Sequence, residues 1–392
     1  MQGNTGKDND SNEKIAIGNE KIAKSPVIAI TGMGSEHGEE TSIEGALLAS
    51  KLGVDVRYIG SAKADGVKTI PVKDEDEGHH KMEELLNNKE IDGAVTMHYP
   101  FPIGVATVGL AVTPSKGKKM FIATTTGTTG TDRIPSMVTN AICGIIAAKA
   151  CGVKAPKVGI LNIDGARQTE IKLRELKSKG YDISFADSAR EGGGAILRGN
   201  DVLTGSADVL VCDSLTGNVL SKMLSAFSSG GSYETVGFGY GPGIGEGYDK
   251  LVLIISRASG APVIGNALKY ASDLVDGNVF EVANAEFKAA NVAGLKLIAI
   301  SDKNASKTKL SGTEGNPDDV LDTQISEPKK EPVTAQIAGI EIMDLEDGVA
   351  MLKKNGIYAE SGMGCTGPII LVSEANLTKA EEELKKAGFI AE

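Results

Sequence analysis

The sequence contains no tryptophan, and aromatic residues occupy only 4% of its 392 positions. Proteins that bind nucleic-acid bases or sugars commonly stack them on aromatic rings, so this composition fits such ligands poorly. Lysine and arginine total 41 against 52 acidic residues, which gives a net charge of −11, and no basic stripe is present. We therefore expect no nucleic-acid partner.

Long apolar runs and cysteine clusters are also missing. No segment of about 20 apolar residues and no signal peptide are present, so we expect no membrane association and a cytoplasmic location. The four cysteines, Cys143, Cys151, Cys212 and Cys365, fit neither a disulfide framework nor a CxxC metal pair. The first three lie in apolar segments and are interpreted as core residues. We predict reduced thiols, no metal and no bound cofactor.

Glycine is abundant, with 49 residues, and apolar segments alternate with amphipathic ones. Short Val/Ile/Leu runs separated by helical segments are typical of a parallel sheet covered on both faces. We predict a three-layer α/β/α fold with a mostly parallel sheet and ligands after the carboxyl ends of its strands. The predicted strands span residues 27–31, 56–60, 93–97, 120–124, 157–163, 208–213, 251–256 and 368–373. The predicted helices span residues 41–52, 78–89, 136–151, 167–179, 217–228, 262–275, 284–293, 344–354 and 377–387.

Composition divides the chain into four parts. Residues 1–24 form a polar N-terminal tail, and residues 25–301 form the α/β body. Residues 302–332 are polar, contain three prolines and are predicted to be a flexible linker. A flexible segment of this length reaches roughly 30 Å. Residues 333–392 form a small α/β module.

A glycine-rich segment in that module surrounds one thiol: Ser361-Gly362-Met363-Gly364-Cys365-Thr366-Gly367-Pro368. Glycines admit positive φ and let amide groups converge on a small anion. A thiolate at such a turn can attack a carbonyl, with the same amides receiving the developing oxyanion. The competing interpretation is a tight turn around a buried, inert cysteine.

In the body, an apolar strand delivers Asp213, Gly217 and Asn218 into the turn before a helix. Asp213 can accept from backbone amides or orient a base, and Gly217 allows close approach to a ligand. Asn218 can donate to a carbonyl or phosphate oxygen. The alternative is N-cap and Asx-turn chemistry alone.

Two further segments are candidates for anion binding. Residues 237–247 hold six alternating glycines, including Gly241, Gly243 and Gly245, which can cradle a phosphate or an acyl group through backbone N–H groups. A mobile loop over the site is the competing view. Residues 123–133 combine threonines and glycines with Arg133, a candidate charged clamp, and the alternative there is a solvated turn. His98 is interpreted as a surface or hydrogen-bonded side chain.

Three segments in the same order resemble the phosphate acyltransferase (PlsX-type) family of phospholipid synthesis: residues 156–163, 208–219, and 241–247 leading to Asn266-Ala267. The resemblance implies the isocitrate/isopropylmalate dehydrogenase-like form of the α/β/α fold. One departure is residues 98–104, where that family carries a Ser-Ala-Gly-Asn-Thr-Gly turn. The departure argues against simple phosphorolysis of an acyl carrier by the body alone.

The whole chain resembles a narrower family, the alpha subunits of component C of glycine/sarcosine/betaine reductase, through residues 31–38 and 362–368. In that family component C takes a carboxymethyl group from selenoprotein A as an acetyl thioester and releases it to inorganic phosphate as acetyl phosphate. The resemblance implies that Cys365 carries the acetyl group. It implies a hetero-oligomer with a component C beta subunit, with selenoprotein A as a partner and component B as an indirect one. Component B would select glycine, sarcosine or betaine, so this sequence leaves the upstream substrate open.

A thioester on Cys365 must be attacked by phosphate, which needs an anion pocket. We expect that pocket at Arg133, Asn218 and the glycines of residues 237–247. Two other interpretations stay open: a cytosolic phosphate acyltransferase acting on acyl carrier protein, and a non-catalytic scaffold for a catalytic beta partner.

Overall fold

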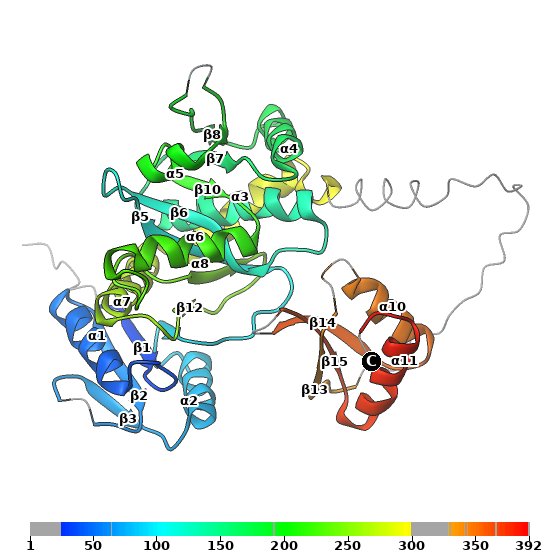
Figure 1. Ribbon diagram of the computed structural model, residues 1–392, viewed down its shortest axis with the longest axis horizontal. Helices are drawn as coiled ribbons and strands as arrows, with labels where there is room; N and C mark the ends of the chain where they lie inside the picture. The colour runs from blue at the N-terminus through cyan, green and yellow to red at the C-terminus, as the bar shows by residue number, and fades with distance from the viewer. Residues whose placement is uncertain are drawn as a thin grey trace, which may run out of the picture.

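The computed structural model describes residues 25–63, 65–190, 193–298, 331–340, 344–364 and 367–390, together with Pro328 and Ile342. The predicted N-terminal tail, nearly all of the predicted linker, and Cys365 lie outside the described residues. The body folds around a sheet of 12 strands, and the C-terminal module has a separate sheet of three (Figure 1).

The N-terminal half of the large sheet is parallel throughout, in the order β3-β2-β1-β4-β12. All five residues of β1, VIAIT, are buried, which explains why this strand is almost entirely apolar in sequence. Ile28 pairs with Val56 on one side and with Gly93 on the other. The strands are β1 (Val27–Thr31), β2 (Asp55–Gly60), β3 (Lys68–Pro71), β4 (Gly93–Thr96) and β12 (Val252–Ile254).

The other half has the order β5-β6-β10-β7-β8, with β9 also paired to β7. Its strands are parallel except for β5 and β6, which form an antiparallel pair. The register of that pair shifts between Ala106 and Val108. The strands are β5 (Val105–Val112), β6 (Lys119–Thr128), β7 (Lys157–Leu161), β8 (Ser184–Phe185), β9 (Ile196–Leu197) and β10 (Val209–Val211).

Strand β11 (Gly241–Gly245) joins the two halves and runs antiparallel to both of its neighbours, β12 and β5. It corrects the predicted loop, because Gly241, Gly243 and Gly245 are buried inside the sheet. A Cβ at Gly241 would lie 1.8 Å from the carbonyl oxygen of Val108, so the neighbouring strand leaves no room for a side chain. The repeated glycines therefore serve close strand packing at this junction.

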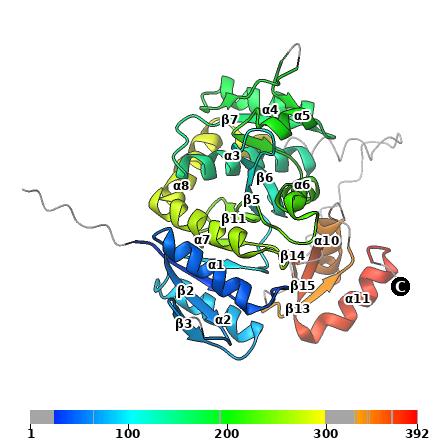
Figure 2. The ribbon, with the colours of Figure 1, turned by 60° about the vertical axis from the view of Figure 1, so that its left-hand side comes forward.

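Helices cover both faces of the sheet (Figures 1 and 2). In the N-terminal half, α1 and α7 pack together over β1. Helix α2 contacts β1 and β2 and packs with them in a separate hydrophobic cluster. In the other half, α3 packs with α4 and α8, and α6 packs against β5 and β6. The predicted three-layer α/β/α fold is thereby confirmed. The helices are α1 (Glu39–Lys51), α2 (Glu75–Asn87), α3 (Arg133–Ala150), α4 (Ala166–Ser178), α5 (Gly199–Thr204), α6 (Ser214–Ala226), η1 (Phe227–Ser229), α7 (Ala261–Asp276) and α8 (Val279–Val292).

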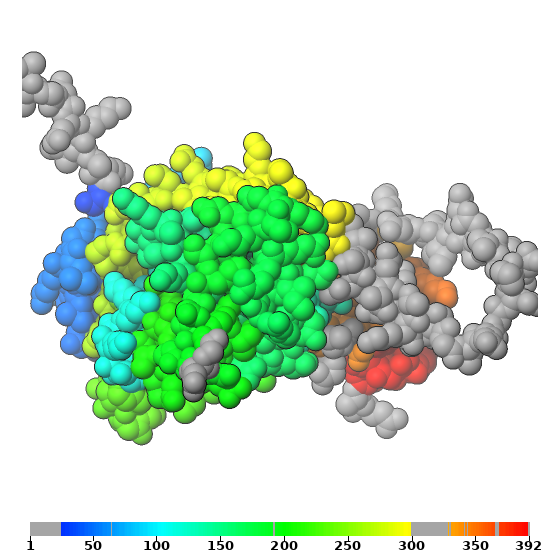
Figure 3. Space-filling model, turned by 90° about the horizontal axis from the view of Figure 1, so that it is seen from above, coloured from blue at the N-terminus to red at the C-terminus, as the bar shows by residue number. Residues whose placement is uncertain are grey.

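The C-terminal module, orange and red in Figure 3, has its own hydrophobic core and the strand order β13-β15-β14. Leu345, Leu352 and Leu384 from its two helices pack with Ile370 of β15 in that core. Ile103 of the body packs against the same cluster, so the module rests on the body near the start of β5. Its elements are β13 (Ala335–Ala338), α10 (Leu345–Lys354), β14 (Ala359–Gly364), β15 (Gly367–Val372), η2 (Glu374–Asn376) and α11 (Leu377–Lys386).

Candidate active site

A cavity of about 360 Å³ lies where the two halves of the large sheet and the C-terminal module meet. The N-terminal half contributes residues that follow the carboxyl ends of β4 and β12, the usual position of ligands in α/β sheets. The module contributes Met363 and Gly364 from the end of β14. Polar side chains in the lining belong to Glu36, His98, Tyr99, Thr126, Asn218, Lys222, Tyr240, Ser256 and Arg257.

Two successive turns of α6 face this cavity through Asn218 and Lys222. Residues four apart on a helix lie on the same face, so the amide and the ammonium group are neighbours. The helix begins directly after β10, where its N-cap residue Asp213 accepts a hydrogen bond from the Thr216 backbone N–H at 2.9 Å. Strand, cap and helical spacing together position two hydrogen-bond donors suited to an oxyanion.

Arg257 brings a second cation to the cavity and fastens the glycine-rich loop that follows β1. Its Nη1 donates to the Gly34 carbonyl oxygen at 2.9 Å, and its Nη2 forms a 2.8 Å ion pair with Glu75 Oε1. Its own carbonyl oxygen accepts from the Glu36 backbone N–H at 2.9 Å. The planar guanidinium, held at these points, can present its remaining donors to a small oxyanion.

His98, interpreted from the sequence as a surface or hydrogen-bonded side chain, is half-buried and lines the cavity. Burial lowers the pKa of His98 below its usual 6.5, and the nearby His79 and Arg257 lower it further, while Glu75 raises it. The His79 and His98 rings meet edge to face, with centroids 6.2 Å apart. His98 is therefore mainly neutral at pH 7 and able to accept a proton.

The predicted residues Arg133 and Asp213 lie together, bound to each other. Arg133 Nη2 donates to Asp213 Oδ2 at 2.8 Å, and Arg133 Nε donates to the Asp164 carbonyl oxygen at 2.9 Å. Neither residue is part of the cavity lining. The capping interaction expected as the alternative for Asp213 is present, whereas a phosphate clamp at Arg133 stays a prediction.

Gly217 lies on the buried side of α6, facing β6. A Cβ there would be 1.8 Å from the Thr124 carbonyl oxygen and 3.0 Å from the Cys212 sulfur. The absence of a side chain lets the helix pack directly on the strand. Close helix–strand packing accounts for this glycine without a ligand.

Cys365 lies outside the described residues, but it follows Gly364 directly in the sequence. The pairing of β14 with β15 extends to Gly364 and Gly367, the described residues on either side of Cys365 and Thr366. Gly362 and Gly364 have extended backbone in β14 and are not among the glycines with positive φ. On the N-terminal side of Cys365 the structure therefore has a regular strand end, and that end lines the cavity. The part of the predicted glycine nest at Cys365 and Thr366 lies outside the described residues.

Lys222 and Arg257 were missed by the sequence interpretation, although both carried a signal. Lys222 follows Asn218 by one helical turn, so the face that presents one must present the other. Arg257 is the first charged residue after the strand predicted at 251–256, the position where ligands of parallel sheets are bound.

Within the described ranges, no three His, Cys, Asp or Glu side chains lie close enough together to hold a metal ion. The same residues include no helix that is both long and apolar enough to cross a membrane.

Comparison with known proteins identifies the family. Residues 27–371 match the family described as "Fatty acid synthesis protein". The chain belongs to this family. It is 52% identical over 366 residues to the alpha subunit of the glycine/sarcosine/betaine reductase complex component C of Peptoclostridium acidaminophilum, covering 93% of this chain and 92% of that subunit.

More distant relatives of the chain are phosphate acyltransferases. The phosphate acyltransferase of Cyanothece sp. (strain PCC 7425 / ATCC 29141) is 25% identical over 334 residues, covering 64% of this chain and 92% of that enzyme. Among solved structures, a branched-chain phosphotransacylase from Enterococcus faecalis V583 superposes with a TM-score of 0.45 and 16% identity, covering 64% of this chain and 99% of that one.

Proposed function

We propose that this chain is the alpha subunit of component C of a glycine/sarcosine/betaine reductase. It works in a cytoplasmic complex with a beta subunit and selenoprotein A, and component B is an indirect partner. Cys365 carries an acetyl group as a thioester, and inorganic phosphate is the co-substrate that accepts it. The identity to the Peptoclostridium subunit over nearly the full length of both chains supports this assignment.

The observation that carries the proposal is the meeting of β14 with the cations of the body. Gly364 lines the same cavity as Asn218, Lys222 and Arg257. Because Cys365 is the next residue in the sequence, an acyl group on its sulfur would have these donors within the same site. An anion pocket beside an acylated thiol is what phosphorolysis of a thioester requires.

The first reaction forms the thioester. The selenium–carbon bond of carboxymethylated selenoprotein A breaks, and the methylene carbon becomes a methyl group. The Cys365 sulfur bonds to the carboxyl carbon, and one carboxyl oxygen leaves as water. A thiol of selenoprotein A gives its proton to that carbon and its sulfur bonds to the selenium, so the formation of this selenium–sulfur bond supplies the two electrons that reduce the carbon.

The second reaction releases acetyl phosphate. A phosphate oxygen attacks the thioester carbonyl carbon, and the negative charge that develops on the carbonyl oxygen is stabilised by fixed donors. The carbon–sulfur bond then breaks, and the Cys365 thiolate leaves. Lys222 and Arg257 neutralise the entering phosphate, and Asn218 is the neutral donor for an oxygen of the reacting groups.

A phosphate acyltransferase acting on acyl carrier protein is the second candidate, favoured by the similarity to the Cyanothece enzyme. In that reaction phosphate attacks a carrier-bound thioester directly, and Cys365 carries no acyl group. The two candidates therefore differ in whether an acetylated cysteine forms on this chain.

The test uses the complete complex with carboxymethylated selenoprotein A. Omitting phosphate should leave the peptide that contains Cys365 acetylated, as read by mass spectrometry, and adding phosphate should discharge it as acetyl phosphate. The Cys365→Ser variant should lose acetyl phosphate formation entirely. Normal turnover by that variant would overturn the assignment.

Cys151→Ser is the matched control, because burial raises the pKa of that thiol to about 12 and it has no place in the cavity lining. We expect this variant to keep full activity. Acetyl label on a beta subunit alone would favour the scaffold interpretation. Phosphorolysis of acyl carrier protein thioesters without selenoprotein A would favour the acyltransferase.

A further inference from the structure

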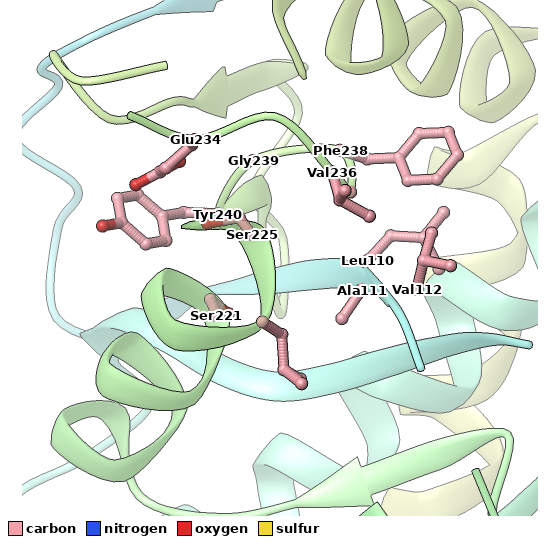
Figure 4. A pocket seen from close by; sticks show the side chains of 12 residues that line it. Leu110, Ala111, Val112, Ser221, Ser225, Glu234, Val236, Phe238, Gly239 and Tyr240 are labelled. Carbon is pink, nitrogen blue, oxygen red and sulfur yellow. The ribbon is translucent and has the colours of Figure 1, made fainter. Parts of the chain in front are cut away.

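Glu234 is a buried carboxyl group beside the cavity, and the proposed chemistry leaves it without a role. Its side chain is only 3% exposed. Its backbone forms an isolated parallel bridge with Ser259, and its N–H donates to the Ala258 carbonyl oxygen at 2.9 Å. Figure 4 shows Glu234 and Tyr240 turned to one side of a small adjoining pocket, away from the ring of Phe238. The carboxyl group is thus held in a fixed, dry position.

The two carboxyl oxygens of Glu234 have unequal surroundings. Oε2 accepts a hydrogen bond from Ser259 Oγ at 3.2 Å. Oε1 is fully buried and has no hydrogen-bond partner among the described residues. Lys222 Nζ lies 4.0 Å from Oε1. A buried oxygen without a donor is costly when charged, so the ionised form of Glu234 is supported by nearby hydroxyl groups, Ser256 foremost, together with this ammonium group.

Lys222 stands between the buried carboxyl and the open cavity. Its side chain is 52% exposed, in contrast to that of Glu234, and it belongs to the cavity lining. An oxyanion in the cavity would compete with Glu234 for the same ammonium group. Occupancy of the cavity and the charge on Glu234 are therefore coupled through one side chain.

We propose that Glu234 positions the Lys222 ammonium before an anion enters the cavity and takes up a proton when a tetrahedral dianion binds there. This inference rests on the proposed function, because it takes the cavity to be the phosphate site. Glu234 acts through Lys222 and touches no substrate, so it is a positioning residue. The proton comes from solvent, and no covalent bond other than O–H changes.

The direction of the coupling follows from the groups around the carboxyl. Burial raises the pKa of Glu234 above 4.5, whereas the Ser256 hydroxyl, Lys222 and the hydroxyls of Ser259 and Ser225 lower it. A dianion that draws Lys222 toward itself weakens one of the lowering influences and adds negative charge nearby. The pKa of Glu234 then rises further, and a neutral carboxyl removes its repulsion of the anion.

Other charged or titrating groups around Glu234 come from each neighbouring element. Tyr240 stays neutral, because burial and Glu234 itself raise its pKa. Arg257, two residues before Ser259, is paired with Glu75. Across the cavity, the other titratable residues of the lining are Glu36, His98 and Tyr99, and burial raises the pKa of Tyr99. A dianion also favours protonation of His98, so a test must separate the contribution of His98 from that of Glu234.

The experiment measures sulfate binding to the whole protein by isothermal titration calorimetry. Sulfate is a tetrahedral dianion that does not titrate near neutral pH, so any proton exchanged with the buffer is bound or released by the protein. Titrations near pH 6.5, in buffers of different ionisation enthalpy, give the number of protons taken up per sulfate. We expect net proton uptake by the wild-type protein and by His98→Gln, with a larger value in the wild type.

Glu234→Gln should lose more than half of the wild-type uptake, and the Glu234→Gln/His98→Gln double variant should lose nearly all of it. Lys222→Met is a second variant that changes only a half-exposed side chain. It should also reduce uptake, because removing the ammonium group raises the pKa of Glu234 before sulfate arrives and leaves less of the carboxylate to be protonated on binding. Glu281→Gln, an exposed residue of α8, is the control that should match the wild type.

Undiminished uptake by both Glu234→Gln and Lys222→Met would overturn the inference, as would complete loss of uptake in His98→Gln. Absence of sulfate binding to the wild-type protein would instead overturn the cavity as the anion site, and with it this part of the proposed function. The two failures are therefore distinguishable.

Discussion

Arg133 and Asp213, 80 residues apart in the sequence, form a 2.8 Å ion pair between the first turn of α3 and the N-cap of α6. Arg257 pairs with Glu75 at the same distance, yet it also lines the cavity. Both arginines are about equally exposed, at 41% and 44%. The two arginines thus have similar ion pairs, but the guanidinium of Arg257 lines the cavity and that of Arg133 does not.

The two arginines should differ in their effect on phosphate. Replacing Arg257 with Gln removes a charge-assisted donor from the cavity, and such a donor contributes about 2 kcal/mol. We expect the KM for phosphate in acetyl phosphate formation to rise roughly 30-fold. Arg133→Gln is the matched comparison: because Arg133 lies outside the cavity lining, we expect the KM to stay within about twofold, whereas a phosphate clamp at Arg133 would raise the KM as well. Equal increases for both variants would contradict the assignment of the anion site.

Gly217 should be intolerant of even one added methyl group. A Cβ at this position would lie 1.8 Å from a backbone carbonyl oxygen, which cannot move as a side chain can. Gly217→Ala should lower the free energy of unfolding by about 3 kcal/mol, as measured by urea denaturation. Gly199→Ala, in the first turn of α5, adds a Cβ that would meet no neighbouring atom within 4 Å, and it should change the free energy by less than about 0.5 kcal/mol. A ligand-only role for Gly217 would leave the stability unchanged.

The lowered pKa of His98 links stability to pH. In the folded protein the imidazole binds its proton at a lower pH than the usual 6.5 of an unfolded chain. As pH falls through 6.5 the unfolded state gains the proton first, so the folded state loses stability below that value. Above it the stabilisation is fully present. When the pH is lowered from above 6.5 to well below it, the free energy of unfolding should therefore fall less in the His98→Gln variant than in the wild type. Guanidinium denaturation at both pH values measures this difference. Parallel pH profiles for variant and wild type would contradict this prediction.

The thiols should differ sharply in reactivity. Burial raises the pKa of Cys143 and Cys151 to about 12, and it raises the pKa of Cys212 further, with Asp213 adding to the effect. Brief treatment of the folded protein with iodoacetamide at pH 7.5 should therefore leave these three unmodified. We expect alkylation at Cys365 alone, located by peptide mass spectrometry, and modification of all four thiols after denaturation. Protection of Cys365 in the native protein would argue against a reactive thiol.

Most elements of the fold could be predicted because the apolar residues within each of them follow one regular pattern. The buried parallel strands β1, β10 and β12 are short apolar runs, and helices such as α7 show an apolar face of regular spacing. Strand β11 could not be predicted in this way. Read from neighbouring residues alone, its glycines predict a loop. They are needed because a backbone carbonyl of β5, more than 100 residues earlier in the sequence, leaves no room for a side chain.

The site was predictable only in part for the same reason. Asn218 was found because the strand, turn and helix that position it are contiguous in sequence. The pairing of Arg133 with Asp213, and the burial of Glu234 beside Lys222, depend on contacts between distant segments. Glycine spacing around Cys365 suggested a nest, but cross-strand pairing with β15 makes Gly362 and Gly364 part of a strand. Local patterns therefore indicated which residue types matter more reliably than they indicated what those residues contact.

The strand order has a consequence for how the molecule assembles. Strands β4 and β5 are close in sequence, but β12 and β11, which come about 150 residues later in the chain, lie between them in the sheet. The segment from β1 to β4 can pair by itself early in folding, whereas the junction must wait for distant strands and loses more loop-closure entropy. Met363 and Gly364 reach the cavity from farther still along the chain. Completing the cavity therefore requires contacts between the most widely separated segments of the chain, and these contacts close the longest loops.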